Sequence, residues 1–187
     1  MAKIRVIAGS AKGRKLRLVP GGVTRPIGDR VKESLFNIIG NDVLHSRWLD
    51  LFAGTGSVGI EALSRGAERA LFIDINKKAI ETVIFNLQHT QLIDRAKVLR
   101  IDAFDFLQGE QEGDFDYIYI APPQYANLWI KALKVLDETS SWLHKGGWVI
   151  VQIHPKEYEP HEYLNLVEFD QRKYGNTLLS FYEMLDR

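Results

Sequence analysis

The stretch DLFAGTGSVGIEALSRGA, from Asp50 to Ala67, places three glycines between an apolar run and a helical pattern. Gly54, Gly56 and Gly59 match the spacing G-x-G-x-x-G. Glycines at these places allow a tight turn and let the backbone come close to a nucleotide-like ligand. Because the same loop serves several such ligands, it predicts a strand, a binding loop and a helix without selecting the ligand.

The rest of the chain alternates between strand and helix patterns, which indicates an α/β fold with a parallel sheet covered by helices. Predicted strands cover residues 48–52, 70–73, 97–101, 117–120 and 147–153, and predicted helices cover 58–64, 78–87 and 129–137. Two further strands, near 164–172 and 177–185, are separated only by the short turn 174–176. That turn leaves no room for a crossover helix, so these strands must pair antiparallel.

A basic segment precedes this domain. Residues 4–8 and 15–19 alternate apolar with basic side chains, so a β-hairpin extension is expected over residues 1–28 and the main domain over residues 29–187. The first helix is expected to have Asp29 as its N-cap and to stop at Gly40. Residues 1–32 hold nine lysines and arginines against one acid, although the whole chain has no net charge. This pattern favours a surface that faces a polyanion, while charge alone fits a solvated basic hairpin equally well.

The chain contains no cysteine, which excludes disulfides, thiolate zinc sites and a cysteine nucleophile. Methylation of a pyrimidine at C5 needs such a thiolate, so that reaction is excluded too. No cluster of histidines and acids has metal-ligand spacing, and no metal is expected. No apolar run approaches the roughly 18 residues of a membrane span, and the N-terminus does not have the pattern of a signal peptide, so a cytoplasmic location is expected.

Three acids fall where successive predicted strands end: Asp50, Asp74 and Asp102. Asp74 lies twenty residues after Gly54, where a carboxylate can accept hydrogen bonds from ribose hydroxyls. Asp50 would lie close to the pyrophosphate of a dinucleotide and repel it. S-adenosylmethionine has a sulfonium and an ammonium in place of phosphate, so the three acids together favour this cofactor over NAD. Taken alone, Asp50 is also explained as a helix or turn cap and Asp102 as an Asx-turn.

The segment APPQY, Ala121 to Tyr125, ends the predicted strand 117–120, because two prolines cannot continue it. The carboxyl ends of parallel strands are where open α/β folds bind ligands, so an aromatic residue here is a candidate platform for a flat ligand. His154 follows the predicted strand 147–153 and is either a proton acceptor or a loop residue.

Four segments together resemble a known family. TRPIGDRVKESLFNII (24–39), DLFAGTGSVGIEALSRGA (50–67), APPQY (121–125) and KYGNTLLSFYE (173–183) resemble, in order and spacing, the RsmD-like methyltransferases. Those enzymes methylate the exocyclic N2 of a guanine in small-subunit (16S) ribosomal RNA. The resemblance implies a Rossmann-like class I S-adenosylmethionine-dependent methyltransferase, with a seven-stranded mixed sheet whose last strand is antiparallel. A monomer that acts on ribosomal RNA or on the assembling 30S subunit is expected.

The resemblance also implies roles for individual residues. Those expected to bind the cofactor are Asp50, Phe52, Ala53, Gly54, Thr55, Gly56, Asp74, Ile75, Asp102, Ala103 and Phe104. Those expected to meet RNA phosphates, which give affinity rather than sequence preference, are Lys12, Arg14, Lys15, Arg25 and Arg30. Those expected at the catalytic position are Ala121, Pro122, Pro123, Gln124 and Tyr125.

The catalytic segment departs from the family pattern of Asp-Pro-Pro followed by Tyr or Phe, because Ala121 replaces the acid and Gln124 is inserted before Tyr125. The carbonyls of Ala121 and Pro122 and the Gln124 amide remain as acceptors, and Tyr125 or Trp129 could stack on a base at about 1–3 kcal/mol. A lost charged acceptor costs about 1.5–3 kcal/mol, or roughly one to two decades of rate. Three alternatives stay open: another RNA or DNA amino-methyltransferase, an inactive RNA-binding relative, and an NAD-dependent oxidoreductase.

Overall fold

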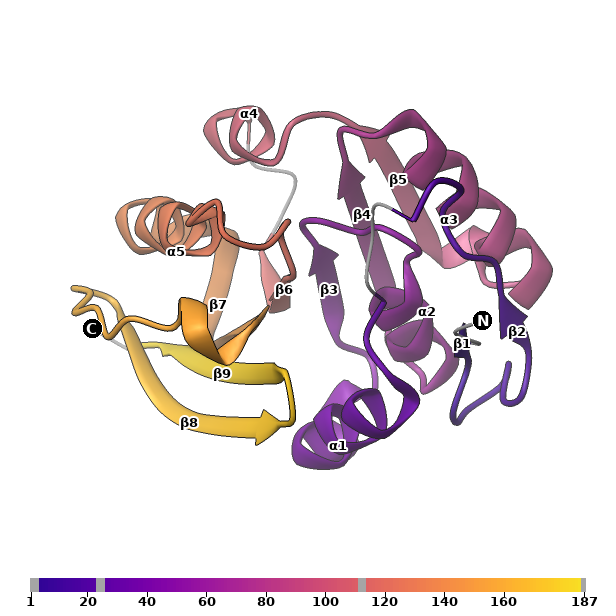
Figure 1. The fold of residues 1–187 in the computed structure, drawn as a ribbon, viewed down its shortest axis with the longest axis horizontal. Helices are drawn as coiled ribbons and strands as arrows, with labels where there is room; N and C mark the ends of the chain where they lie inside the picture. The colour runs from indigo at the N-terminus through magenta and orange to yellow at the C-terminus, as the bar shows by residue number, and fades with distance from the viewer. Residues whose placement is uncertain (1–3, 23–25, 111–113, 186–187) are drawn as a thin grey trace. The chain divides into compact units, whose positions relative to one another are not determined.

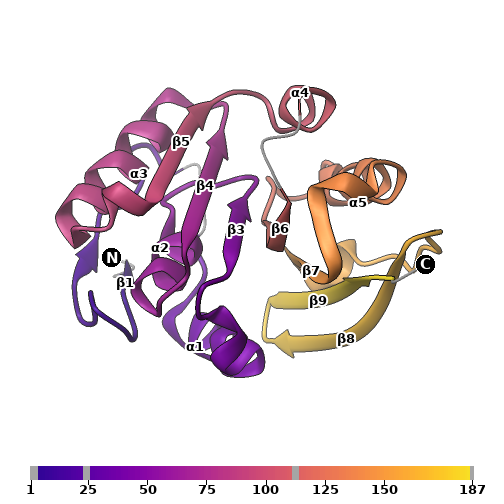
Figure 2. The ribbon, with the colours of Figure 1, turned by 180° about the vertical axis from the view of Figure 1, so that it is seen from behind.

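The computed structural model describes residues 4–22, 26–110 and 114–185 of the chain. These residues form two compact units, residues 1–103 and 104–187, and each is described by itself. Seven of the strands make one mixed sheet, as predicted, and the first two strands of the chain make a separate two-stranded sheet. Figures 1 and 2 show the chain from opposite sides.

The first unit is built on three parallel strands in the order β5, β4, β3. Its elements are β1 (Ile4–Arg5), β2 (Lys15–Leu16), α1 (Asp29–Ile39), η1 (Gly40–Val43), β3 (Arg47–Asp50), α2 (Ser57–Ser64), β4 (Arg69–Asp74), α3 (Lys77–Thr90), η2 (Ile93–Arg95) and β5 (Ala96–Arg100). Helices α2 and α3 cover the same face of these strands (Figures 1 and 2). Residues 70–73 of β4 are all buried, which explains why this strand is continuously apolar rather than alternating.

The predicted hairpin is present but short: among the described residues its strand pairing covers Ile4–Arg5 and Lys15–Leu16, and backbone bonds between Val6 and residues 13 and 14 continue it into the turn. Helix α1 begins at Asp29, so the prediction that Asp29 is its N-cap was wrong: the N-cap is Gly28, and the Asp29 carboxylate accepts from Arg5 Nε at 2.9 Å. The predicted stop is confirmed, since Gly40 is the C-cap and has a φ of 62°. Strand β3 ends at Asp50 and not at residue 52, and beyond this end Ala53 N–H still donates to Ile73 O of β4 at 2.8 Å.

The second unit contains the remaining four strands in the order β6, β7, β9, β8. Its elements are α4 (Ala103–Gln108, whose first residue belongs to the first unit), β6 (Phe115–Ile120), α5 (Leu128–Glu138), η3 (Ser140–Trp142), β7 (Leu143–Ile153), η4 (Pro155–Glu157), β8 (Leu166–Tyr174) and β9 (Thr177–Met184). Strand β6 runs parallel to β7, while β9 runs antiparallel between β7 and β8. The prediction that the last strand is inserted antiparallel is therefore confirmed.

None of the helices in the described ranges has both the length and the apolar content that a membrane span requires. The proposed boundary after residue 28 stays a prediction. Side chains of the hairpin, including Ile4 and Leu16, are buried within the first unit.

Candidate active site

The glycine loop runs from the end of β3 to the start of α2, as its spacing predicts. Gly54 and Gly56 have φ values of 55° and 75°, which residues with side chains rarely adopt, and Gly56 is the N-cap of α2. Gly59 serves a different purpose, since a Cβ there would lie 2.4 Å from the Phe72 ring. The first two glycines therefore shape the loop, and the third lets α2 pack closely on β4.

Asp50 is buried at the end of β3, with 1% of its surface exposed. Burial raises the pKa of its carboxyl well above the usual value of 3.8; a hydrogen bond from the Gly59 backbone opposes the rise, and the charge of Asp74 adds to it. Oδ1 of Asp50 is buried and has no hydrogen-bond partner among the described residues. A buried acceptor without a donor is costly, so this oxygen fits a ligand that brings a cation or an N–H to it.

Asp74 ends β4, and its two carboxylate oxygens hold the turns on either side. Gly54 N–H donates to Oδ2 at 2.9 Å, and Asn76 N–H donates to Oδ1 at 2.8 Å. Each oxygen keeps a second lone pair, so the carboxylate can still accept from ribose hydroxyls. The next residue, Ile75, is 63% exposed. An exposed isoleucine beside this acid offers an apolar surface to a nucleoside base.

The other residues expected to bind the cofactor fall in both units. Phe52 and Asp102 are half-buried, and Ala53, Thr55 and Ala103 are buried in the first unit. Phe104 belongs to the second unit, where it is buried and Lys131 Nζ lies 3.9 Å from the centre of its ring. The ring of Phe104 is therefore already covered by a cation within its own unit.

The APPQY segment leaves β6 and enters a turn before α5, with Ala121 and Pro122 half-buried and the next three residues exposed. Tyr125 is 67% exposed and has a φ of 61°, which is left-handed backbone. Trp129 cannot be a stacking platform, because it is fully buried under Tyr158 and His161. The helical pattern of α5 places that residue on its buried face, so of the two candidate stacking rings Tyr125 is the exposed one.

Glu157 is a residue of this region that the sequence did not single out. Its carboxylate is buried and accepts from Tyr125 N–H at 2.6 Å and from His154 N–H at 3.1 Å. His154 Nδ1 accepts from Lys156 N–H, so His154 caps the short helix η4, which fits the loop interpretation, while its role as a proton acceptor stays a prediction. A glutamate after a histidine-proline pair looks like an ordinary surface acid, and no sequence signal reveals its contact 32 residues away.

The residues expected to contact RNA differ in whether their side chains already have a partner in the structure. Lys12, Lys15 and Arg30 are exposed, and no ion pair to them is formed within the described residues. Arg14 instead donates to His89 O at 2.5 Å, at the end of α3. Arg25 lies outside the described residues.

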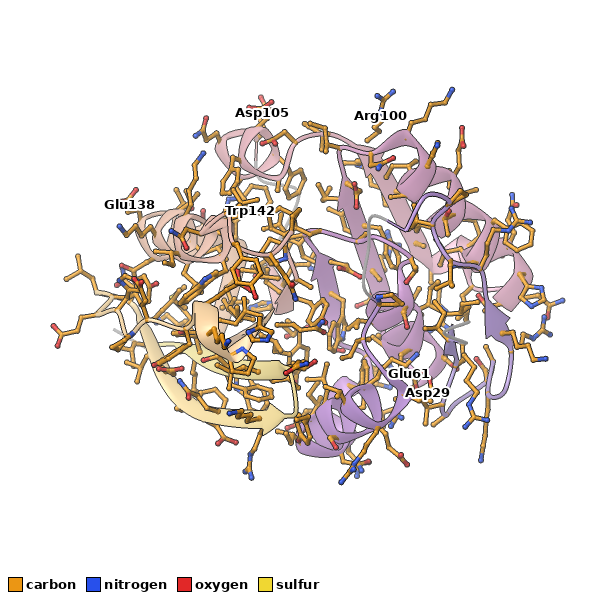
Figure 3. The ribbon with its side chains drawn as sticks, in the orientation of Figure 1. Asp29, Glu61, Arg100, Asp105, Glu138 and Trp142 are labelled. Carbon is orange, nitrogen blue, oxygen red and sulfur yellow. The ribbon has the colours of Figure 1, made fainter. Side chains whose placement is uncertain are left out.

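Lys32 belongs to the basic N-terminal segment, yet it is fully buried. Its ammonium donates to Arg5 O at 2.6 Å and to Ser57 Oγ at 2.9 Å, and it lies 3.5 Å from Glu61 Oε2. Burial lowers the pKa of Lys32, and the charge of Glu61 opposes this. Glu61, labelled in Figure 3, also accepts from the backbone of residues 7 and 8. This lysine therefore fastens the extension to α2 and is not available to a polyanion.

Asn86 makes a similar connection from α3. Its side chain accepts from Arg17 N–H at 2.7 Å and donates to Arg17 O at 3.1 Å and to Thr55 O at 2.9 Å. Thr55 lies in the glycine loop, so one buried amide joins the hairpin to the loop.

The mixed sheet, with its antiparallel last strand and a glycine loop at the end of β3, defines a class I methyltransferase. Residues 4–183 match the family described as conserved hypothetical protein 95, and the chain belongs to that family, of S-adenosylmethionine-dependent methyltransferases. YlbH of Bacillus subtilis, provisionally named an rRNA methyltransferase, is 43% identical over 96% of this chain and 98% of its own. Ribosomal RNA small subunit methyltransferase D of Haemophilus influenzae is 38% identical over 80% of this chain and 78% of its own.

The solved structures agree with this assignment. That of yhhF from Escherichia coli, provisionally named a methyltransferase, has a TM-score of 0.85 at 30% identity and covers 98% of both chains. An RNA methyltransferase from Salinibacter ruber, solved with S-adenosyl-L-homocysteine, shares the fold at 16% identity with a TM-score of 0.63, covering 87% of this chain and 95% of its own. The resemblance to the RsmD-like methyltransferases is confirmed, and an NAD-dependent oxidoreductase is ruled out.

Proposed function

We propose that this protein transfers a methyl group from S-adenosylmethionine to the exocyclic N2 of a guanine in small-subunit ribosomal RNA. The substrate is the RNA itself or the assembling 30S subunit, and the protein acts as a monomer in the cytoplasm. The observation that supports S-adenosylmethionine as the methyl donor is the buried Oδ1 of Asp50, before the glycine loop, which lacks a donor among the described residues.

The donor groups of the first unit fit S-adenosylmethionine. Asp50 Oδ1 would accept from its ammonium, and Asp74 would accept from the ribose hydroxyls, with Ile75 against the base. Asp102 would accept from the adenine amino group. When bound, S-adenosylmethionine supplies a methyl group on a positively charged sulfur. The Coulomb preference of these acids for a cationic ligand without phosphate is what distinguishes it from a dinucleotide.

The second unit would hold the base. The exposed ring of Tyr125 would stack on the guanine, and the carbonyls of Ala121 and Pro122 would accept from its amino group. Hydrogen bonds to both N–H bonds keep the nitrogen lone pair free, and the carbonyl dipoles stabilise the positive charge that develops on nitrogen during attack. No side chain needs to act as a nucleophile, so positioning carries most of the rate.

The exposed lysines of the hairpin would contribute affinity. Lys12 and Lys15 carry charge without a partner in the described ranges, so they are suited to phosphate contacts. Such contacts weaken steeply with salt and do not read sequence. Charge reversal at both lysines should therefore raise the KM for RNA and leave the affinity for S-adenosylmethionine unchanged.

The test is methyl transfer to small-subunit RNA from cells that lack this protein, followed by mass spectrometry of the modified nucleoside. N2-methylguanosine at one position supports the proposal, whereas another methylated base, or transfer to DNA, would identify a different amino-methyltransferase. RNA binding without transfer at saturating cofactor would identify an inactive relative. Tyr125→Ala should lower turnover sharply, while Tyr174→Ala, at the last residue of β8, is the control.

A further inference from the structure

Glu157 joins the APPQY segment to the chain that follows β7. It ends the short helix η4, is 8% exposed, and accepts two backbone N–H bonds through different oxygens. Oε1 accepts from Tyr125 at 2.6 Å and Oε2 from His154 at 3.1 Å. We propose that Glu157 is a positioning residue that holds the Tyr125 ring in the orientation that stacks on the target base. This inference rests on the proposed function and adds a residue to it.

The backbone at Tyr125 needs such a restraint. A φ of 61° is unfavourable for a residue with a Cβ, and Asn127 has a similar value of 53°. The two prolines before Gln124 have no N–H with which to attach the segment to its surroundings. A hydrogen bond from an amide to a carboxylate is roughly twice as strong as one to a neutral acceptor. The carboxylate of Glu157 therefore supplies a fixed point where the local backbone is least favourable.

The same carboxylate also fixes the neighbouring ring. The rings of Tyr125 and His154 lie 6.1 Å apart at an angle of 40°, and each residue gives its backbone N–H to Glu157. His154 Nδ1 is in turn fixed by Lys156 N–H. One buried side chain thus sets the backbone from which both rings project, while the Tyr125 ring itself stays exposed.

A purely structural role is the competing explanation, because Glu157 and His154 form a capping box at η4. That role involves Oε2 and would lower stability without changing how the folded enzyme treats RNA. The contact to Tyr125 involves Oε1, and its loss should change the kinetics with RNA. Glu157→Gln keeps the shape and one acceptor oxygen, so it can satisfy only one of the two donors.

The experiment compares Glu157→Ala and Glu157→Gln with Glu162→Gln, a nearby exposed glutamate, using the full-length protein. Methyl transfer to small-subunit RNA gives kcat and KM, calorimetry gives the Kd for S-adenosylmethionine, and hydrogen exchange reports on residues 121–128. We expect kcat/KM for RNA to fall about fivefold to a hundredfold in Glu157→Ala, the range that base stacking covers, and less in Glu157→Gln. Exchange in residues 121–128 should accelerate, the cofactor Kd should stay within about twofold, and Glu162→Gln should match the wild type.

A double-mutant cycle separates the two roles. If Glu157 acts through Tyr125, adding Glu157→Ala to Tyr125→Ala lowers kcat/KM no further. Independent, multiplicative losses would overturn the inference, as would a folded Glu157→Gln or Glu157→Ala variant with wild-type kinetics and wild-type exchange. If the wild-type protein methylated no RNA, the proposed function would fail together with this role, whereas a fully active Glu157→Ala variant would overturn this role alone.

Discussion

Replacement of Asp50 by asparagine should weaken cofactor binding and at the same time stabilise the protein without ligand. Asp50 is buried, its pKa is raised by that burial, and one of its oxygens has no donor among the described residues. Asparagine keeps an oxygen for the Gly59 backbone but removes the charge. A hydrogen bond to a charged group contributes about 1.5–3 kcal/mol, so the Kd for S-adenosylmethionine should rise roughly tenfold to a hundredfold.

The effect on stability should depend on pH. Because the pKa of Asp50 is higher in the folded state than its usual value of 3.8, protonated Asp50 favours the folded state. That contribution is fully present below about pH 3.8 and is lost as the pH rises through the folded-state pKa. The wild type should therefore lose stability relative to Asp50→Asn as the pH is raised from about 4 towards neutrality, so the difference between their free energies of unfolding should grow in favour of the variant.

Cofactor binding should show the same linkage. A ligand ammonium favours ionised Asp50, so the wild-type Kd should fall with rising pH and binding should release protons in that range. Calorimetry in two buffers with different ionisation enthalpies measures this release, and urea unfolding at several pH values measures stability. Asp42→Asn, at an exposed position, is the control. Wild-type cofactor affinity in Asp50→Asn would refute the assignment of Asp50 to the ligand.

Three further predictions concern single substitutions. Gly9→Ala should lower the free energy of unfolding in urea by well over about 2 kcal/mol, because the added Cβ would lie 1.8 Å from Ser64 O. Gly13 has the same φ of 82°, and a Cβ there would meet nothing within 4 Å. Gly13→Ala should therefore cost only the roughly 1–2 kcal/mol of left-handed backbone strain. Asn86→Ala should lower the free energy of unfolding by about 1–3 kcal/mol and weaken cofactor binding as measured by calorimetry. An unchanged cofactor Kd would show that the hydrogen bond from Asn86 to Thr55 O does not hold the glycine loop. Ala121→Asp should preserve or raise kcat in the methyl-transfer assay, since it adds a charged acceptor, and a lower kcat would show that a charged side chain at position 121 does not assist the transfer.

The sequence by itself determined the parts of the fold that depend on local patterns. Glycine spacing predicted the loop after β3, and the short turn at Gly175 required β8 and β9 to pair antiparallel, because no crossover fits there. The acids at strand ends could be found for the same reason, since parallel strands bring their carboxyl ends to one edge. The missing thiol excluded a class of chemistry without any structure.

Tertiary packing alone decided which side chains became available to a ligand. In the sequence, Lys32 looks like one more basic residue of the N-terminal segment. In the fold its buried ammonium donates to Arg5 O and Ser57 Oγ, which lie 27 and 25 positions away in the chain. Glu157 contacts Tyr125 across 32 positions. The sequence suggests Trp129 as a second stacking ring, but in the fold it is fully buried and packs against Tyr158. Periodicity shows which face of an element is apolar, while such pairings depend on where distant elements meet, and that is set by the packing of the folded chain.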